Sequence, residues 1–190
     1  MEKFEKKLRS LVKLDNELLE KFKNCFYETE YRKGNIFIKK GQFSPKIGFL
    51  NSGVLAEFCS NKNQKNFAMN FFTPSCFVGS FSSLITENTN RMEIVCLTDC
   101  EVLVGDYQKI KGLYAHYPEV EKLLKHLAYQ MLLQQEQRVV ELVTMKAKDR
   151  YDLLKDRHPT LEQQVPLYQI ASYLGITGIQ LSRIRSKRTP

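Results

Sequence analysis

The residues with the clearest chemistry are the cations at the carboxyl-terminal end of the chain. Arg183, Arg185, Lys187 and Arg188 follow one another closely, and no carboxylate lies between Gly178 and the last residue. The whole chain of 190 residues carries a formal net charge of +8. Closely spaced guanidinium and ammonium groups bind phosphates, so this segment is suited to a polyanion such as DNA.

The stretch that carries these cations, Val165–Lys187, predicts two short helices joined by a tight turn. Ile170 and Leu174 are one helical turn apart and define the apolar face of the first helix. Gly175 suits the left-handed end of that helix, and Thr177 suits the N-cap of the second. This pattern is typical of the helix-turn-helix, whose second helix enters the major groove of DNA. An ordinary helical hairpin with a basic end is the alternative interpretation.

The second helix supplies the side chains that would read DNA. We expect Arg183 to contact base edges, with Gln180 reaching adenine and Ile179 touching a thymine methyl. The other cations, together with polar side chains of the first helix, are expected to grip phosphates. The complete set expected to contact DNA is Tyr168, Gln169, Thr177, Gly178, Ile179, Gln180, Ser182, Arg183, Arg185, Lys187 and Arg188.

The segments that precede this motif differ in their predicted secondary structure. Residues 2–23 predict an amphipathic helix that Asp15 interrupts as an N-cap. Short apolar runs with turn residues between them then predict a barrel or sandwich of jelly-roll type. Its strands are expected at 35–38, 47–50, 54–59, 66–72, 94–96 and 100–104, with a hairpin tip at 61–64 and a loop at 73–79.

A long helix is predicted from Pro118, which suits the first helical position, to about Met145. Its apolar residues alternate at spacings of 4 and 3, as in the seam of a two-stranded coiled coil. We therefore expect a homodimerisation helix; packing of this helix along its own sheet is the alternative. The residues expected in the dimer seam are Val120, Leu124, Leu127 and Met131, with Val139, Val140 and Val143 further on.

These patterns together predict an α+β protein. A jelly-roll sensor domain is expected over residues 1–115, the dimerisation helix over 116–146, and a winged-helix-like helix-turn-helix over 147–190, with the wing short or absent. The chain has no long apolar run and no apolar segment near its start, so we expect a cytoplasmic location without membrane contact. Its cysteines (Cys25, Cys59, Cys76, Cys96 and Cys100) are then expected to be reduced and buried.

The order of β-roll, long helix and helix-turn-helix resembles the superfamily of the cyclic-AMP receptor protein and the fumarate–nitrate regulator, the Crp–Fnr regulators. The segments that carry the resemblance are Lys33–Gly41, Asn51–Gly53, Phe77–Gly79, Arg91 and Ile170–Thr177. The resemblance covers nearly the whole chain. It implies a homodimer that binds double-stranded DNA, responds to a small-molecule effector and contacts RNA polymerase.

The resemblance also implies a phosphate-binding cassette at Gly79, Ser80, Phe81, Arg91 and Met92. Gly79 and Arg91 match the family pattern, and both backbone amides and a guanidinium suit a cyclic phosphate. Ser80 stands where relatives carry a glutamate for the ribose, and Met92 where they carry a hydroxyl residue. We therefore expect no binding of cyclic AMP in the usual manner. The chain shows no iron–sulfur or haem signature, so the effector stays unassigned.

These observations favour a sequence-specific transcription regulator. An enzyme is not expected, because the predicted strands carry no histidine and no carboxylate cluster that would hold a metal. A binding module for a small molecule or a partner, with a degenerate DNA-binding domain, is the alternative function. Gly178 and Ile179 favour this alternative, because they occupy positions where relatives often carry base-reading arginine and glutamate.

Overall fold

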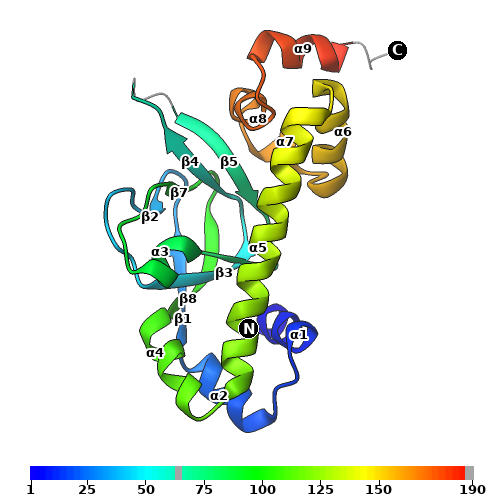
Figure 1. Ribbon diagram of the computed structural model, residues 1–190. Coiled ribbons are helices and arrows are strands. Elements are labelled where there is room, and N and C mark those ends of the chain that lie inside the picture. Colours follow the sequence, from blue (N-terminus) through cyan, green and yellow to red (C-terminus); the bar gives the residue numbers. More distant parts are fainter. Residues whose placement is uncertain (63–65, 187–190) are drawn as a thin grey trace.

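The computed structural model describes residues 1–62 and 66–186 and consists of a β-roll flanked by helices (Figure 1). The first sheet has the strand order β1-β8-β3-β6 and the second the order β2-β7-β4-β5, with all pairs antiparallel. The strands are β1 Phe26–Tyr31, β2 Ile36–Ile38, β3 Lys46–Ser52, β4 Leu55–Ser60, β5 Asn66–Phe72, β6 Cys76–Val78, β7 Glu93–Cys96 and β8 Cys100–Asp106. The helices are α1 Glu2–Leu11, α2 Asn16–Lys23, α3 Phe81–Thr86, α4 Tyr107–Gly112, α5 Pro118–Thr144, α6 Ala147–Arg157, α7 Leu161–Gln164, α8 Leu167–Tyr173 and α9 Gly178–Ser186, with a 3₁₀ turn at Leu113–Ala115.

Alternation along the strands divides the apolar residues between the inside of the roll and its outer faces. On β3, Leu50 belongs to the core between the sheets, whereas its neighbour Phe49 packs outward. On β4, Leu55 faces the same inner core, and Ala56 belongs to the outer face of the second sheet. Each sheet is therefore covered on both sides, as its largely apolar strands require.

The outer face of the first sheet is covered by α1, α2, α4 and the first half of α5. Phe4 of α1 is fully buried there, with its ring centroid 5.2 Å from that of Phe49. The predicted N-cap is confirmed, because the Asp15 carboxylate accepts a hydrogen bond of 2.7 Å from the backbone N–H of Leu18. The amino-terminal helices are thus part of this core.

The packing of the first half of α5 shows that the predicted dimer seam is wrong. Val120, Leu124 and Leu127 are 0%, 7% and 4% exposed because they pack into the core on the first sheet, and Met131 is partly buried against it. The 4–3–4 spacing of these residues identified an apolar helical face, but that face belongs to the chain's own core. These side chains are therefore unavailable to a second copy.

The second half of α5 presents a different apolar stripe, which no described residue covers. Tyr129, Leu132, Val139 and Val143 are 62%, 64%, 59% and 79% exposed and, with Glu136 between them, repeat at spacings of 3 and 4. Leu133, Val140 and Leu142 are exposed beside this stripe. Part of the stripe, from Val139 onward, was included in the predicted continuation of the seam.

Helices α6 to α9 lie at one end of α5, and α8 packs on β5 at the outer face of the second sheet (Figure 1). Their core is continuous with that face: Tyr151 and Leu154 of α6 and Ile170 of α8 share one apolar cluster with Phe71 of β5. The carboxyl-terminal helices are therefore joined to the β-roll by packing as well as by the chain.

Several short elements escaped prediction. Strand β1 and helices α3 and α4 were not individually expected, and β6 lies inside the predicted loop at 73–79. Strand β6 is held by pairing with β3, where Gly48 lies opposite Val78, so its conformation depends on a distant segment. Residues 63 and 64 of the predicted hairpin tip at 61–64 lie outside the described residues.

The cysteines are free thiols, but only two are fully buried. Cys96 and Cys100 are buried at the end of the roll, while Cys25, Cys59 and Cys76 are half-buried, which corrects the expectation for these three. Burial raises the pKa of the Cys76 thiol to about 12, so this thiol stays protonated and unreactive at neutral pH.

Candidate functional site

The turn between α8 and α9 forms as its residues predict. Gly175 has a φ of +68°, the left-handed conformation that glycine adopts without strain. The Thr177 hydroxyl accepts a hydrogen bond of 3.2 Å from the Gln180 backbone N–H, and the Gln180 side-chain oxygen accepts one of 2.9 Å from the Thr177 N–H. This reciprocal pair is a capping box, which fixes the start of α9.

The capping box changes the role of Gln180. Its side-chain oxygen is occupied by the turn, so the bidentate contact to adenine that the sequence suggested would cost the cap. The predicted residues that remain free on α9 are Ile179, which is 69% exposed, and the exposed Ser182 and Arg183. Within residues 1–62 and 66–186, the Arg183 side chain has no ion-pair partner.

Arg185 differs from Arg183 because it is held within its own domain. Its Nε lies 3.4 Å from a carboxylate oxygen of Glu162, which also accepts a hydrogen bond of 2.6 Å from the Tyr151 hydroxyl. A phosphate contact by Arg185 would compete with this arrangement. The predicted Lys187 and Arg188 lie outside the described residues.

Helix α8 faces the β-roll as well as solvent. The Ser172 hydroxyl accepts a hydrogen bond of 3.2 Å from the Ala68 N–H of β5, and the Tyr173 ring lies 5.2 Å from the Phe71 ring. The predicted phosphate contacts lie near the start of the same helix: Tyr168 is 68% exposed and its hydroxyl accepts a hydrogen bond of 3.3 Å from the Gln169 amide. A displacement of β5 would therefore displace α8 as well.

The predicted effector residues lie at the two ends of one connecting segment. Gly79 and Ser80 precede α3, Phe81 is buried as its first residue, and Arg91 is exposed beyond the end of α3. Met92 is half-buried beside Arg91. An added Cβ at Gly79 would meet the Lys46 carbonyl oxygen at 3.5 Å, which is ordinary contact, so sterics alone do not demand glycine there.

Asn90 anchors the segment that presents Arg91. Its side chain is 2% exposed and its amide donates to the backbone carbonyl oxygens of Lys39 and Gln42. Its backbone N–H and C=O pair with Gln42 and Gly41. The position of Arg91 is therefore set by a polar clamp on the neighbouring loop, a long-range feature that the sequence did not reveal.

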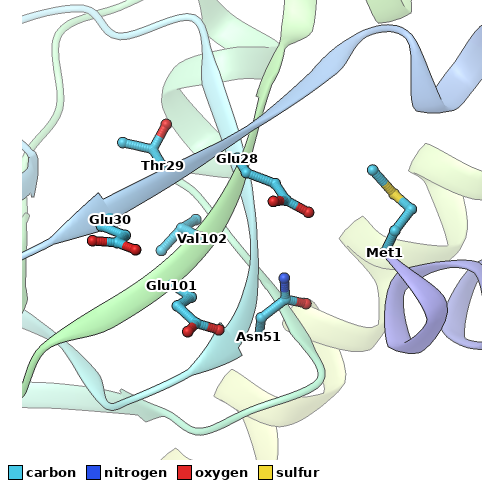
Figure 2. Close-up of a pocket in the computed structure, with 7 residues that line it drawn as sticks. All are labelled: Met1, Glu28, Thr29, Glu30, Asn51, Glu101 and Val102. Atoms are coloured by element: carbon cyan, nitrogen blue, oxygen red, sulfur yellow. The ribbon is translucent and has the colours of Figure 1, made fainter.

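A cavity of about 390 Å³ opens instead near the amino terminus, between Met1 and strands β1 and β8 (Figure 2). Glu28, Glu30 and Glu101 line it together with Asn51. The three carboxylates outnumber the one cationic group of the lining, the α-amino group of Met1, so the cavity has a net negative charge that disfavours a phosphate. This cavity is thus unsuited to a nucleotide.

A carboxyl group is buried inside the roll without a charged partner among the described residues. Glu57 of β4 is 5% exposed and lies opposite the buried Asn70 of β5. Burial raises the pKa of the Glu57 carboxyl to about 7. The carboxyl is therefore largely protonated in mildly acidic solution.

Neither a metal centre nor a membrane span is apparent in the part of the chain that the structure describes. It contains no group of three or more His, Cys, Asp or Glu side chains arranged to hold a metal. None of its helices combines the length and apolar character that crossing a membrane requires.

Comparison with known proteins gives a family match for most of the β-roll. A family model described as "Cyclic nucleotide-binding domain" matches residues 28–117. A search of curated proteins found no match.

Solved structures share the architecture of most of the chain. FixK2 from Bradyrhizobium japonicum is 17% identical with a TM-score of 0.75, covering 85% of this chain and 83% of its own. The c-di-GMP-responsive global regulator CLP of Xanthomonas campestris is 18% identical with a TM-score of 0.70, covering 91% of each chain. The catabolite activator protein of Thermus thermophilus is 21% identical with a TM-score of 0.58, covering 92% of this chain and 83% of its own. Residues 28–117 therefore match the cyclic nucleotide-binding domain family, within a chain that has the fold of the Crp–Fnr regulators.

Proposed function

We propose that this protein is a homodimeric, sequence-specific DNA-binding transcription regulator whose β-roll senses an effector. The observation that carries the proposal is the free face of α9. A capped, pre-formed helix presents the exposed side chains of Ile179, Ser182 and Arg183 on a small domain that is docked against the β-roll. Such an arrangement is typical of a helix-turn-helix, in which the second helix lies in the major groove.

Arg183 is the proposed base-reading residue. A guanidinium can donate two hydrogen bonds to guanine O6 and N7, the commonest specific contact in the major groove. Ile179 would pack against a thymine methyl, and Tyr168 at the start of α8 would contact a phosphate. Arg185 would contribute less than the sequence suggested, because Glu162 already engages it.

Dimerisation is proposed through the exposed stripe of α5 formed by Tyr129, Leu132, Val139 and Val143. Paired copies of this stripe would form a short coiled coil, since its 3–4 spacing is that of a coiled-coil seam. The two copies of α9 would then reach successive major grooves about 34–36 Å apart on a near-palindromic site.

The effector is proposed to be a small molecule that acts through the β-roll at Gly79, Ser80, Phe81, Arg91 and Met92. Ser80 and Met92 replace the residues that would hold a ribose and a cyclic phosphate, so the ligand differs from cyclic AMP or binds it in another way. Binding there would shift the balance between arrangements of α5 and α8.

Selection from random duplexes tests the proposed function. The full chain should enrich one near-palindromic motif, with affinity that falls steeply as salt rises. Arg183→Ala should weaken binding to that motif by about 1–3 kcal/mol and relax the preference at one base pair of each half-site. Arg32→Ala, which removes an exposed arginine directly after β1, is the matched control and should leave affinity unchanged.

Two outcomes would contradict the proposal. Unchanged specific and non-specific binding by Arg183→Ala would exclude α9 as the reading helix. Failure to enrich any motif, together with a clear thermal shift on adding a small molecule, would favour the alternative of a binding module with a degenerate DNA-binding domain. Gly178 and Ile179 motivate this alternative, and the occupied Gln180 side chain adds to it.

A further inference from the structure

A second cavity lies where the β-roll, α5 and the carboxyl-terminal helices meet. Its volume is about 80 Å³, enough for a small anion or a few water molecules. Its lining comes from β5, α5, α8 and the end of α6: Met69, Asn70, Gln134, Gln135, Gln137, Arg138, Arg157, His158 and Tyr173. It shares no residue with the effector positions at Gly79 to Phe81, Arg91 and Met92.

Arg138 is the unusual member of this lining. It lies on the largely exposed second half of α5, yet the residue is only 9% exposed. The guanidinium carbon lies 3.8 Å from the centre of the Tyr173 ring, a cation–π contact. Within the described residues, Arg138 forms no side-chain hydrogen bond or ion pair. A buried cation without an anionic partner is strongly unfavourable, and burial lowers the pKa of this guanidinium.

The charges around Arg138 do not balance. Arg150, Arg157 and Glu141 are the charged side chains that act on it electrostatically, so a single carboxylate faces three guanidinium groups. That carboxylate is already used, because Arg157 Nη2 and Nη1 donate to its two oxygens at 2.5 and 3.1 Å. Arg150 instead donates to the backbone carbonyl oxygens of Met145 and Leu174. The cluster therefore has an excess of positive charge.

The remaining lining suits a hydrogen-bond acceptor. Gln134 and Gln137 contribute amide groups, and Asn70 lies on the opposite wall. His158 is hydrogen-bonded at Nδ1 to the Thr73 hydroxyl at 3.2 Å, and burial together with the Arg157 charge lowers its pKa, which favours the neutral imidazole. No carboxylate lines the cavity.

We propose that this cavity, between β5, α5 and α8, is an anion site that binds a small oxyanion of the phosphate class. Arg138 supplies the binding charge, and the guanidinium of Arg157 and the amides of Gln134 and Gln137 complete the donor set. The bound anion bridges the β-roll to the helix that precedes the recognition helix. It thereby fixes α8 on β5 and sets the orientation of α9.

Calorimetric titration of the full chain with inorganic phosphate, at constant ionic strength and without DNA, tests this site. We expect saturable binding with a Kd of about 1 mM or tighter, whereas chloride should give none. A phosphomonoester such as 5′-AMP is titrated in parallel: binding of both ligands identifies a site open to larger molecules, and binding of phosphate alone identifies a closed one. Absence of saturable binding by either ligand would overturn the proposal.

Variants locate the bound anion. Arg138→Gln should weaken phosphate binding by about ten- to a hundredfold, the effect of losing a charge-assisted hydrogen bond. Arg32→Gln, at an exposed arginine away from the cavity, should not change it. If Arg138→Gln does not fold, NMR of the unmodified chain locates the anion through the side-chain ¹⁵N resonances. Phosphate should shift the Nε signals of Arg138 and Arg157 but not that of Arg32. Equal binding by Arg138→Gln, or unmoved Arg138 and Arg157 signals, would refute the assignment. Because no DNA is present, this outcome is independent of the proposed function.

Discussion

The β-roll carries helices on both outer faces. The two interfaces between helices and sheet, the first joint on the first sheet and the second joint on the second sheet, differ in chemistry. On the first sheet, α1, α2 and the first half of α5 meet the strands through apolar side chains such as Phe4, Phe22 and Phe49. On the second sheet, α8 also contributes an aromatic contact, Tyr173 on Phe71. Beside that contact, however, lie a cavity and a group of partly buried charges.

The difference indicates where the molecule can be regulated. A close-packed apolar joint contributes stability and has one favoured arrangement. A joint that contains charges and a cavity responds to ligands and protons, because their binding changes its electrostatic balance. The second joint is also the one that carries α8 and α9, so we expect control of the proposed DNA binding there, and we expect the first joint to provide stability.

The largest effect is expected from a truncation in the first joint. Phe4 is fully buried among aromatic rings, so Phe4→Ala should lower the free energy of unfolding by about 3–5 kcal/mol. Urea denaturation measures this change. Phe43→Ala, at a residue that is 37% exposed, is the control and should cost far less. Equal losses in both variants would mean that α1 is not part of the core.

The next effect concerns the acid buried inside the second sheet. The folded pKa of Glu57, about 7, lies above the reference value of 4.5, so the folded state holds the proton more tightly than the unfolded chain. Stability should therefore fall as pH rises from about 4.5 to about 7, by up to about 1.4 kcal/mol per pH unit, and then level off. Glu57→Gln should remove this slope in denaturation curves recorded between pH 5 and pH 8. An unchanged slope would contradict the raised pKa.

A smaller loss is expected from the ion pair in the second joint. Glu141→Gln breaks the two-bond contact with Arg157 and removes the one carboxylate of the arginine cluster. Because the Arg157 side chain is 36% exposed and solvent screens it, the loss in unfolding free energy should be about 1–2 kcal/mol. Glu121→Gln, in an exposed pair with Lys125 on the same helix, should cost less than about 0.5 kcal/mol. A Glu141 variant as stable as the Glu121 variant would show that the second joint does not depend on its charges.

The smallest effect on the folded chain is expected at the exposed stripe, which belongs to neither joint. Val143 is 79% exposed, so Val143→Glu should change the unfolding free energy of the protomer by no more than about 0.5 kcal/mol. The dimer dissociation constant should nevertheless rise more than about tenfold, since two carboxylates would meet in the seam. Sedimentation equilibrium measures this constant, with Lys122→Glu, an exposed position off the stripe, as the control. Equal dissociation constants would place the dimer contact elsewhere.

Features that depend on local chemistry were predictable from the sequence. Gly175 and Thr177 gave the turn before α9, Asp15 gave the start of α2, and Pro118 gave the start of α5. Each is a capping or dihedral preference of a single residue toward its neighbours in the chain. These signals need no knowledge of the tertiary structure.

Features that depend on distant packing were not predictable. The spacing of Val120, Leu124 and Leu127 reveals an apolar helix face but does not say whether a sheet or a second copy covers it. Likewise, only the folded chain brings Glu162 to Arg185 and leaves Arg138 without an anionic partner. The binding properties of individual arginines therefore required the structure, although their presence on predicted helices did not.

The most direct test of a dimeric DNA-binding regulator is the stoichiometry of its complex with a selected duplex. Sedimentation velocity of the full chain with a labelled duplex of the enriched motif should show two protomers on each duplex. Val143→Glu should bind the same duplex much more weakly, and Arg183→Ala should lose the preference for the motif. A complex with a single protomer and unreduced affinity, or no complex at all, would contradict the proposed function.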